Sequence, residues 1–173
     1  DQLDITIPPT VTLEEGKRYF WKVRIWDGSG KVSPGTKAAS FTKSIDNSWE
    51  ADWIATGKTE DGPFPYFRKT CLIGKGKVRR AVVYLCGLGC SQLYLNGRAV
   101  EPDRILDPAQ TDYDKKALYS AFDVTSLLVG GKNCIGVMLG AGWYSQDKVW
   151  GGGMTYGRPI LRWQMRVEYA SGK

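Results

Sequence analysis

The 173-residue sequence contains no histidine, and this absence narrows its chemistry. Without histidine there is no Ser-His-Asp or Cys-His catalytic system and no histidine-ligated metal. The four cysteines include no CxxC pair, which argues against a zinc cluster. Cysteines in apolar strands are more often small buried residues, although a disulfide between Cys86 and Cys90 is conceivable. The glycines at 151–153 lack the lysine of a phosphate loop.

Long apolar segments and blocks of one charge are missing too. No apolar run approaches the ~18 residues of a membrane span, and the first residues do not resemble a signal peptide. The formal net charge is +6, but basic residues are scattered among carboxylates. We therefore expect a soluble chain with neither a nucleic-acid partner nor a membrane span, and the compartment is left open.

Aromatic residues and glycine are plentiful. Seven tryptophans and 21 glycines favour packed strands and tight turns over long helices. Asn96-Gly97 lies between alternating residues and predicts a hairpin, because both turn positions tolerate positive φ. Further strands are predicted at 66–73, 79–89, 117–124, 134–139 and 159–169, with a helical turn after residue 124. We therefore predict an all-β fold, with a jelly-roll-like β-sandwich at residues 46–173.

Residues 1–45 predict a separate, smaller unit. The alternation at 18–30 predicts a strand whose odd-numbered side chains, from Tyr19 to Ile25, form a buried face. A second strand is predicted at 37–44, and the tyrosine is typical of the corner of a fibronectin type III domain. Since about three strands stand where such a sandwich needs about seven, we interpret this unit as the C-terminal strands of a fibronectin type III-like domain.

Four aspartates close together in sequence could supply polar chemistry. They are Asp103, Asp107, Asp112 and Asp114. The simplest interpretation is that they cap turns in contact with water. A second is that Asp103, Asp107 and Asp112 bind calcium or sugar hydroxyls, because hard oxygen ligands suit both tasks. A third is that two of them act as the acid and base of a glycosidase.

The glycine-rich segment at 139–159 carries several aromatic residues. Trp143, Tyr144, Trp150 and Tyr156 lie within it. Aromatic faces stack on the apolar faces of sugar rings, while neighbouring polar groups bond the hydroxyls. The alternative is that Trp143 and Trp150 only close the end of the sandwich.

Six segments between residues 49 and 172 carry a family resemblance. They are WEADWIA (49–55), PYFRKT (65–70), GLGCSQLYLNGRAV (87–100), TDYDKKALYSAFDVTSLL (111–128), GKNCIGVMLGAGWY (131–144) and YGRPILRWQMRVEYASG (156–172). In this order they resemble the N-terminal region of bacterial α-L-rhamnosidases of glycoside hydrolase family 78. The resemblance implies a jelly-roll accessory domain akin to rhamnose-binding modules, in which calcium can take part but no cofactor is required.

The resemblance also implies a division of labour within a longer protein. In the family a separate (α/α)6 barrel hydrolyses terminal α-L-rhamnosyl bonds, and this sequence contains none of it. We therefore expect an inactive fragment, truncated at both ends, whose partners are an L-rhamnose-containing glycan and that barrel. The candidate carbohydrate-binding residues are Asp107, Asp112, Tyr113, Trp143, Tyr144 and Trp150.

Three alternatives stay open. Gln110 and Cys90 stand where many relatives have aromatic residues, which favours a structural spacer that has lost its sugar. A self-contained glycosidase would depend on the aspartates. An adhesion module that binds protein would present an exposed apolar patch beside an open strand edge.

Overall fold

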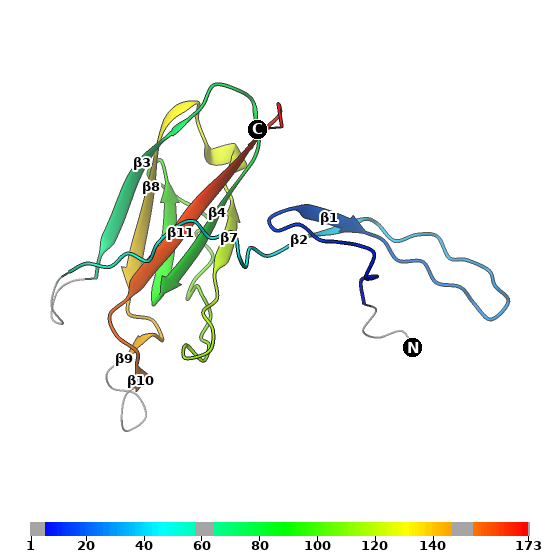
Figure 1. Ribbon diagram of the computed structural model, residues 1–173, viewed down its shortest axis with the longest axis horizontal. Helices are drawn as coiled ribbons and strands as arrows, with labels where there is room; N and C mark the ends of the chain where they lie inside the picture. The colour runs from blue at the N-terminus through cyan, green and yellow to red at the C-terminus, as the bar shows by residue number, and fades with distance from the viewer. Residues whose placement is uncertain (1–5, 58–63, 147–153, 173) are drawn as a thin grey trace. The chain divides into compact units, whose positions relative to one another are not determined.

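The computed structural model describes residues 6–57, 64–146 and 154–172. The chain divides into two compact units, residues 1–49 and 50–173, each built on antiparallel strands (Figure 1). Within the described residues, the only helical element is a short 3-10 turn, η1 (Thr125–Leu127). No helix in these parts of the chain is long and apolar enough to cross a membrane.

The first unit is a hairpin of two strands. Strand β1 (Arg18–Trp21) pairs with β2 (Ala39–Thr42), and the rings of Tyr19 and Phe41 stack with their centroids 5.7 Å apart. The backbone N–H of Glu14 donates to the Tyr19 hydroxyl at 2.7 Å. This bond, in which the tyrosine hydroxyl accepts from upstream backbone, ties Tyr19 to the preceding turn, as the tyrosine of a fibronectin-like corner would be.

The prediction that one face of the strand at 18–30 is buried is wrong. Trp21 and Ile25 were expected inside, but they are 51% and 61% exposed, and Phe20 on the opposite face is 69% exposed. Within the described part of this unit only two strands pair in register, so no second layer covers either face. Alternation indicates which residues share a face, but burial needs a partner sheet.

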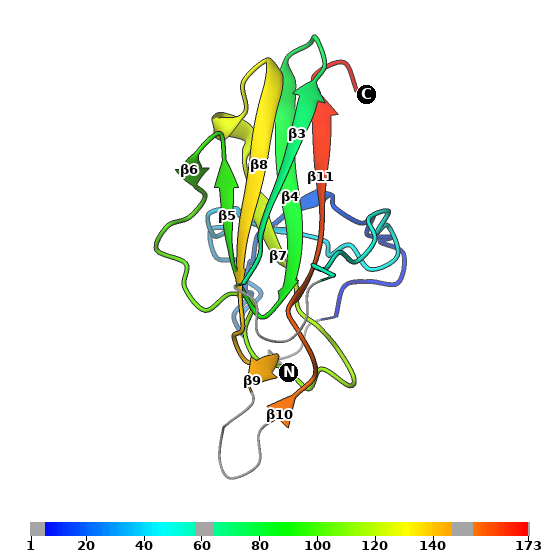
Figure 2. The same ribbon diagram turned by 90° about the vertical axis from the view of Figure 1, so that its left-hand side faces the viewer.

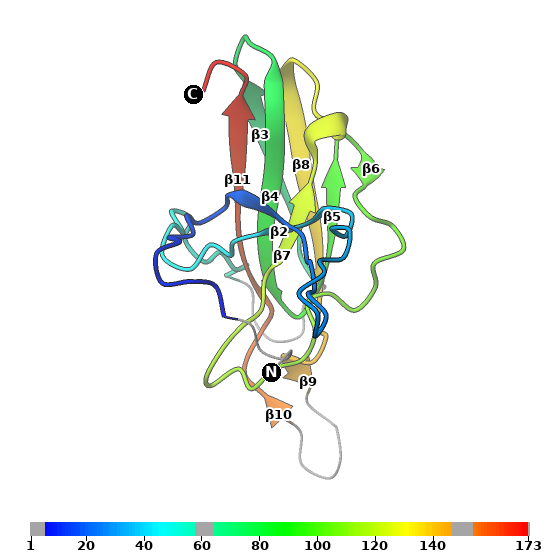
Figure 3. The same cartoon turned by 90° about the vertical axis from the view of Figure 1, so that its right-hand side faces the viewer.

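The second unit contains two larger sheets. In the three-stranded sheet the order is β11 (Ile160–Tyr169), β4 (Val78–Leu88) and β7 (Ser120–Asp123) (Figure 3). In the four-stranded sheet the order is β3 (Tyr66–Ile73), β8 (Gly131–Gly140), β5 (Cys90–Leu95) and β6 (Arg98–Ala99) (Figure 2). A small ribbon of β9 (Ser145–Gln146) and β10 (Met154–Thr155) follows β8. Every strand pair is antiparallel.

The core lies between these two sheets. Val83 and Leu85 of β4 are fully buried, and they belong to one cluster with Leu93 of β5, Val137 of β8 and Leu161 of β11. Alternating strand residues therefore project from both sheets into a shared apolar layer. The prediction of an all-β sandwich is confirmed, while its jelly-roll connectivity stays a prediction.

Local turn chemistry follows the sequence closely. Asn96 and Gly97 have φ values of 51° and 80°, as a type I′ hairpin turn requires, and they join β5 to β6. The strand predicted at 66–73 is β3. The strand predicted at 117–124 is shorter, since β7 covers only Ser120–Asp123. The carbonyl of Leu118, which lies before β7, accepts a hydrogen bond from the Cys86 thiol at 3.0 Å.

Residues 50–54 are laid along the three-stranded sheet. Ile54 pairs with Leu161 through two backbone hydrogen bonds of 2.7 and 2.9 Å. The side-chain oxygen of Gln164 accepts from the Glu50 N–H at 2.8 Å, and Arg162 donates to the Ala51 carbonyl at 2.7 Å. Residues 50–54 therefore pack on the three-stranded sheet.

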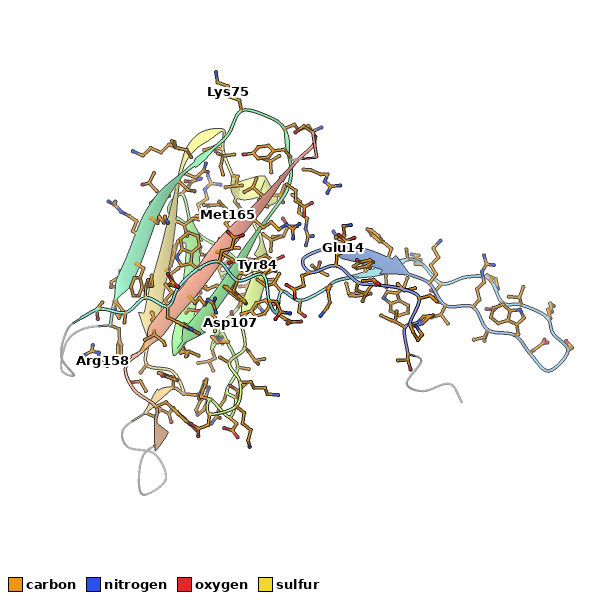
Figure 4. The ribbon with its side chains drawn as sticks, viewed as in Figure 1. Glu14, Lys75, Tyr84, Asp107, Arg158 and Met165 are labelled. Atoms are coloured by element: carbon orange, nitrogen blue, oxygen red, sulfur yellow. The ribbon has the colours of Figure 1, made fainter. Side chains whose placement is uncertain are left out.

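The sandwich interior is open along one side. Strands β3 and β11 are edges of their sheets, and an apolar opening of about 720 Å³ lies between them. Its lining includes Phe67, Val137, Trp163 and Met165, the last of which is labelled in Figure 4. Val137 belongs to the core cluster and the other three side chains are partly buried against it, so this opening is a flank of the core.

Candidate functional site

The candidate residues lie in two loops at one end of the sandwich. One loop joins β6 to β7 and carries Asp107 and Tyr113, and the other follows β8 and carries Trp143 and Tyr144. The loops approach each other because β5 begins where β8 ends, with Cys90 opposite Gly140 in the ladder. Asp107 lies toward this end of the sandwich (Figure 4). We call this region the loop end.

Asp107 anchors its loop through both its side chain and its backbone. The hydroxyl of Ser120 donates to Oδ1 at 2.7 Å, and Nε of Arg104 lies 3.3 Å from the same oxygen. The Asp107 carbonyl accepts from the backbone N–H of Ser91 at 2.8 Å and from its hydroxyl at 3.2 Å. The other carboxylate oxygen, Oδ2, is buried, and the protein supplies no hydrogen-bond donor to it. One oxygen of an otherwise fixed carboxylate is therefore buried without a hydrogen-bond partner within the protein.

Three tyrosine rings pack together at the loop end. Tyr113 meets Tyr144 and Tyr156 edge to face, with centroids 5.3 and 5.2 Å apart, and the latter two rings stack at 5.8 Å. The Tyr113 hydroxyl is buried without a partner in the protein, and burial, with a smaller effect of the Cys90 thiol, raises its pKa. The three rings therefore cover much of one another's surface. Tyr156 was noted in its loop but not selected as a site residue.

The other candidates are more dispersed. Trp143 is 37% exposed, beside the tyrosine cluster in sequence. Asp112 is exposed, lies 2.7 Å from Nζ of Lys115 and accepts from the Asp114 N–H at 3.3 Å. Asp103 is exposed in the same loop. Trp150 lies outside the described residues.

No metal cluster is preformed in the described part of the chain. No three His, Cys, Asp or Glu side chains in residues 6–57, 64–146 and 154–172 are grouped as metal ligands would be. The structure thus brings Tyr113 and Tyr144 together and fixes Asp107, but it does not group Asp103, Asp107 and Asp112 around one point. Calcium stays a prediction.

The cysteines are all free thiols, so the conceivable disulfide between Cys86 and Cys90 is not formed. Burial raises the pKa of Cys86 to about 11. Burial also raises the pKa of Cys90, and the Asp107 carboxylate adds to the effect.

Family models match both units of the chain. Residues 76–173 match the α-L-rhamnosidase N-terminal domain, and residues 2–45 match a Rha78A-like, N-terminal immunoglobulin domain. The immunoglobulin and fibronectin type III folds share the sandwich architecture, which accounts for the predicted likeness. An α-L-rhamnosidase of Formosa agariphila is 34% identical over 191 residues, covering 92% of this chain and 20% of that protein.

Solved structures of α-L-rhamnosidases share the fold. The enzyme from Dictyoglumus thermophilum is 40% identical with a TM-score of 0.79, over 93% of this chain and 19% of that one. The enzyme from Aspergillus terreus is 25% identical with a TM-score of 0.81, over 95% of this chain and 20% of that one. The chain thus spans about a fifth of the length of the relatives it matches. Since the family model covers more than half of its residues, the chain belongs to the family of α-L-rhamnosidase N-terminal domains.

Proposed function

We propose that this chain is a non-catalytic region of an α-L-rhamnosidase that binds or positions rhamnosylated glycans. The full-length protein would hydrolyse terminal α-L-rhamnosyl residues on an (α/α)6 barrel encoded elsewhere in the same polypeptide. Two observations support this division: the family match, and the relatives named α-L-rhamnosidase, which are about five times longer than the matched region.

The loop end is the observation that carries the binding proposal. Trp143 offers a partly exposed indole ring, and Asp107 has a buried carboxylate oxygen that no protein group bonds and that a sugar hydroxyl would reach on a small shift of the loop. A pyranose has an apolar face that suits an aromatic ring and hydroxyls that suit a carboxylate. An indole face and a fixed hydrogen-bond acceptor borne by neighbouring loops are the two elements that such a sugar needs.

A calcium ion would assist sugar binding here by bridging protein and sugar oxygens. Because the described carboxylates do not form a group of three, Asp107 or Asp112 would need help from backbone carbonyls and sugar hydroxyls to complete the coordination. Calcium would then bind appreciably only together with the sugar.

Titration calorimetry with methyl α-L-rhamnoside, with and without calcium, tests the proposal. We expect measurable heat at millimolar sugar and at least a tenfold loss of affinity in Trp143→Ala, since loss of a buried aromatic platform costs about 1.5–3 kcal/mol. Trp53→Ala is the matched control, because Trp53 is similarly exposed at 42% in the same unit but lies before β3. An absence of heat in the unmodified chain would reject sugar binding.

A structural spacer is the second candidate, and the tyrosine cluster favours it. Tyr113, Tyr144 and Tyr156 cover one another, so two of the predicted ligand-binding residues already have aromatic partners. A spacer predicts no heat with the rhamnoside. Neither candidate predicts hydrolysis, so release of phenol from an aryl α-L-rhamnoside, abolished in Asp112→Asn, would instead establish a self-contained glycosidase.

A further inference from the structure

We propose that a groove on the outer face of the four-stranded sheet binds the aryl group of an aryl α-L-rhamnoside whose sugar occupies the loop end. The inference rests on the proposed function for the sugar, but the groove is a separate surface. It assigns to this domain a contribution to the choice of aglycone, the non-sugar part of the glycoside.

The groove follows one row of residues across three strands. Tyr66 of β3 lies opposite Met138 of β8, which lies opposite Gln92 of β5. Neighbouring strands are about 4.8 Å apart, so the side chains at the two ends of this row stand roughly 10 Å from each other. Together with Phe64, Ile105 and Leu106, these residues enclose about 370 Å³. A volume of this size is enough for one aromatic ring system.

The side chains that line the groove are largely apolar, and several of them are exposed to solvent. Tyr66, Ile105 and Leu106 are 76%, 77% and 63% exposed, an unusual concentration of large apolar side chains on a soluble domain. Leu106 also has φ of 53°, a left-handed backbone conformation that is unfavourable for a branched residue. The adjacent Asp107 fixes this part of the loop through Ser91 and Ser120. Strained backbone conformations are concentrated at functional sites. The strained, exposed Leu106 is therefore consistent with a binding surface.

The polar groups of the groove favour an aryl ligand over a second sugar. Gln92 donates to the Val100 carbonyl, and the Ser91 hydroxyl donates to the Asp107 carbonyl, both at 3.2 Å. The guanidinium of Arg104 is paired with Glu101 at 3.0 Å and with Asp107. Three polar side chains of the lining, Ser91, Gln92 and Arg104, are thus already engaged within the protein. A second pyranose would therefore bury several hydroxyls against few free hydrogen-bonding groups. An aryl group needs none.

The groove and the loop end share a boundary. Cys90 lines the groove, and its Sγ is so close to the loop after β8 that a Cβ on Gly142 would lie 2.8 Å from it. Leu106 of the groove precedes Asp107 of the loop end directly in sequence. One glycoside can therefore contact both surfaces, with its sugar toward Asp107 and its aglycone toward Tyr66.

The test compares phenyl and methyl α-L-rhamnoside by titration calorimetry on the intact 173-residue chain. We expect the phenyl glycoside to bind about tenfold more tightly, the order of magnitude for burying one ring. Tyr66→Ala should abolish this preference and leave the affinity for the methyl glycoside unchanged, whereas Tyr66→Phe should retain the preference. Leu72→Ala is the matched control, because Leu72 is 79% exposed on the same strand outside the groove.

The outcomes separate the two proposals. Equal affinities for the two glycosides, or a preference that survives in Tyr66→Ala, would overturn the groove and leave sugar binding intact. Binding of the phenyl glycoside alone, lost in Tyr66→Ala, would support the groove and reject the loop-end sugar site. Binding of neither glycoside would reject both. Because Tyr66 is mostly exposed, its variants should unfold at the same temperature as the parent chain, which thermal denaturation checks.

Discussion

Replacing Asp107 by alanine should destabilise the second unit, whether or not a sugar is bound. The substitution removes the acceptor of the Ser120 hydroxyl at 2.7 Å and the partner of Arg104 at 3.3 Å. Ser120 is 5% exposed, so water cannot readily replace the lost acceptor. The Asp107 side chain itself is 12% exposed.

The magnitude follows from these contacts. A hydrogen bond to a charged group contributes about 1.5–3 kcal/mol, and leaving the buried Ser120 hydroxyl unsatisfied overlaps with that loss rather than adding to it. The partly exposed pair with Arg104 adds about 0.2–1 kcal/mol. We therefore expect Asp107→Ala to lower the free energy of unfolding by about 2–4 kcal/mol. Asp107→Asn, which keeps an oxygen acceptor, should cost roughly half as much.

Urea unfolding followed by tryptophan fluorescence would measure these differences. Asp103→Ala is the matched control, because Asp103 is exposed in the same loop and its loss should change stability by less than about 0.5 kcal/mol. If Asp107→Ala and Asp103→Ala unfolded at the same urea concentration, the anchoring role of Asp107 would be refuted.

Two further predictions concern backbone fit and acid stability. Gly89→Ala should lower the free energy of unfolding by at least about 3 kcal/mol, because a Cβ there would lie 2.1 Å from the Gly140 carbonyl oxygen. Gly97→Ala, where the backbone is strained but the space is open, should lower it by about 1 kcal/mol, and thermal denaturation measures both. Hydrogen bonds from Ser48 and from backbone N–H groups lower the Glu15 pKa from 4.5 to about 2, so its stabilisation of the first unit is present above pH 4.5 and is lost toward pH 2. Carboxyl NMR titration should show that pKa rising in Ser48→Ala, and an unchanged value would contradict the assignment.

Sequence patterns were most reliable where the physical cause is local. The run at 66–73 coincides with β3, and Asn96-Gly97 forms the predicted turn, because alternation and positive φ depend on neighbouring residues only. The strand predicted at 117–124 was too long: β7 begins at Ser120, and the Leu118 carbonyl before it is bonded by the thiol of Cys86, a residue more than thirty positions away.

The same limit governs the candidate site. Sequence placed aspartates and aromatic residues in two loops but gave no means of deciding that Asp107 would bond Ser120 while Asp112 bonded Lys115. It offered no signal that Tyr156 would stack on Tyr144, because the two residues meet only through the return of the chain after β8.

By itself, then, the sequence determined the all-β class, the order of most strands and the family, because these depend on local periodicity, turn chemistry and short segments in register. Tertiary structure alone decided which side chains are covered and which meet. The hairpin residues Trp21 and Ile25 are exposed because no second sheet lies over them among the described residues, and Tyr66 and Leu106 face one groove because the ladder and an anchored loop bring them together. Burial and long-range pairing depend on how separate elements are arranged in space, which local periodicity does not specify.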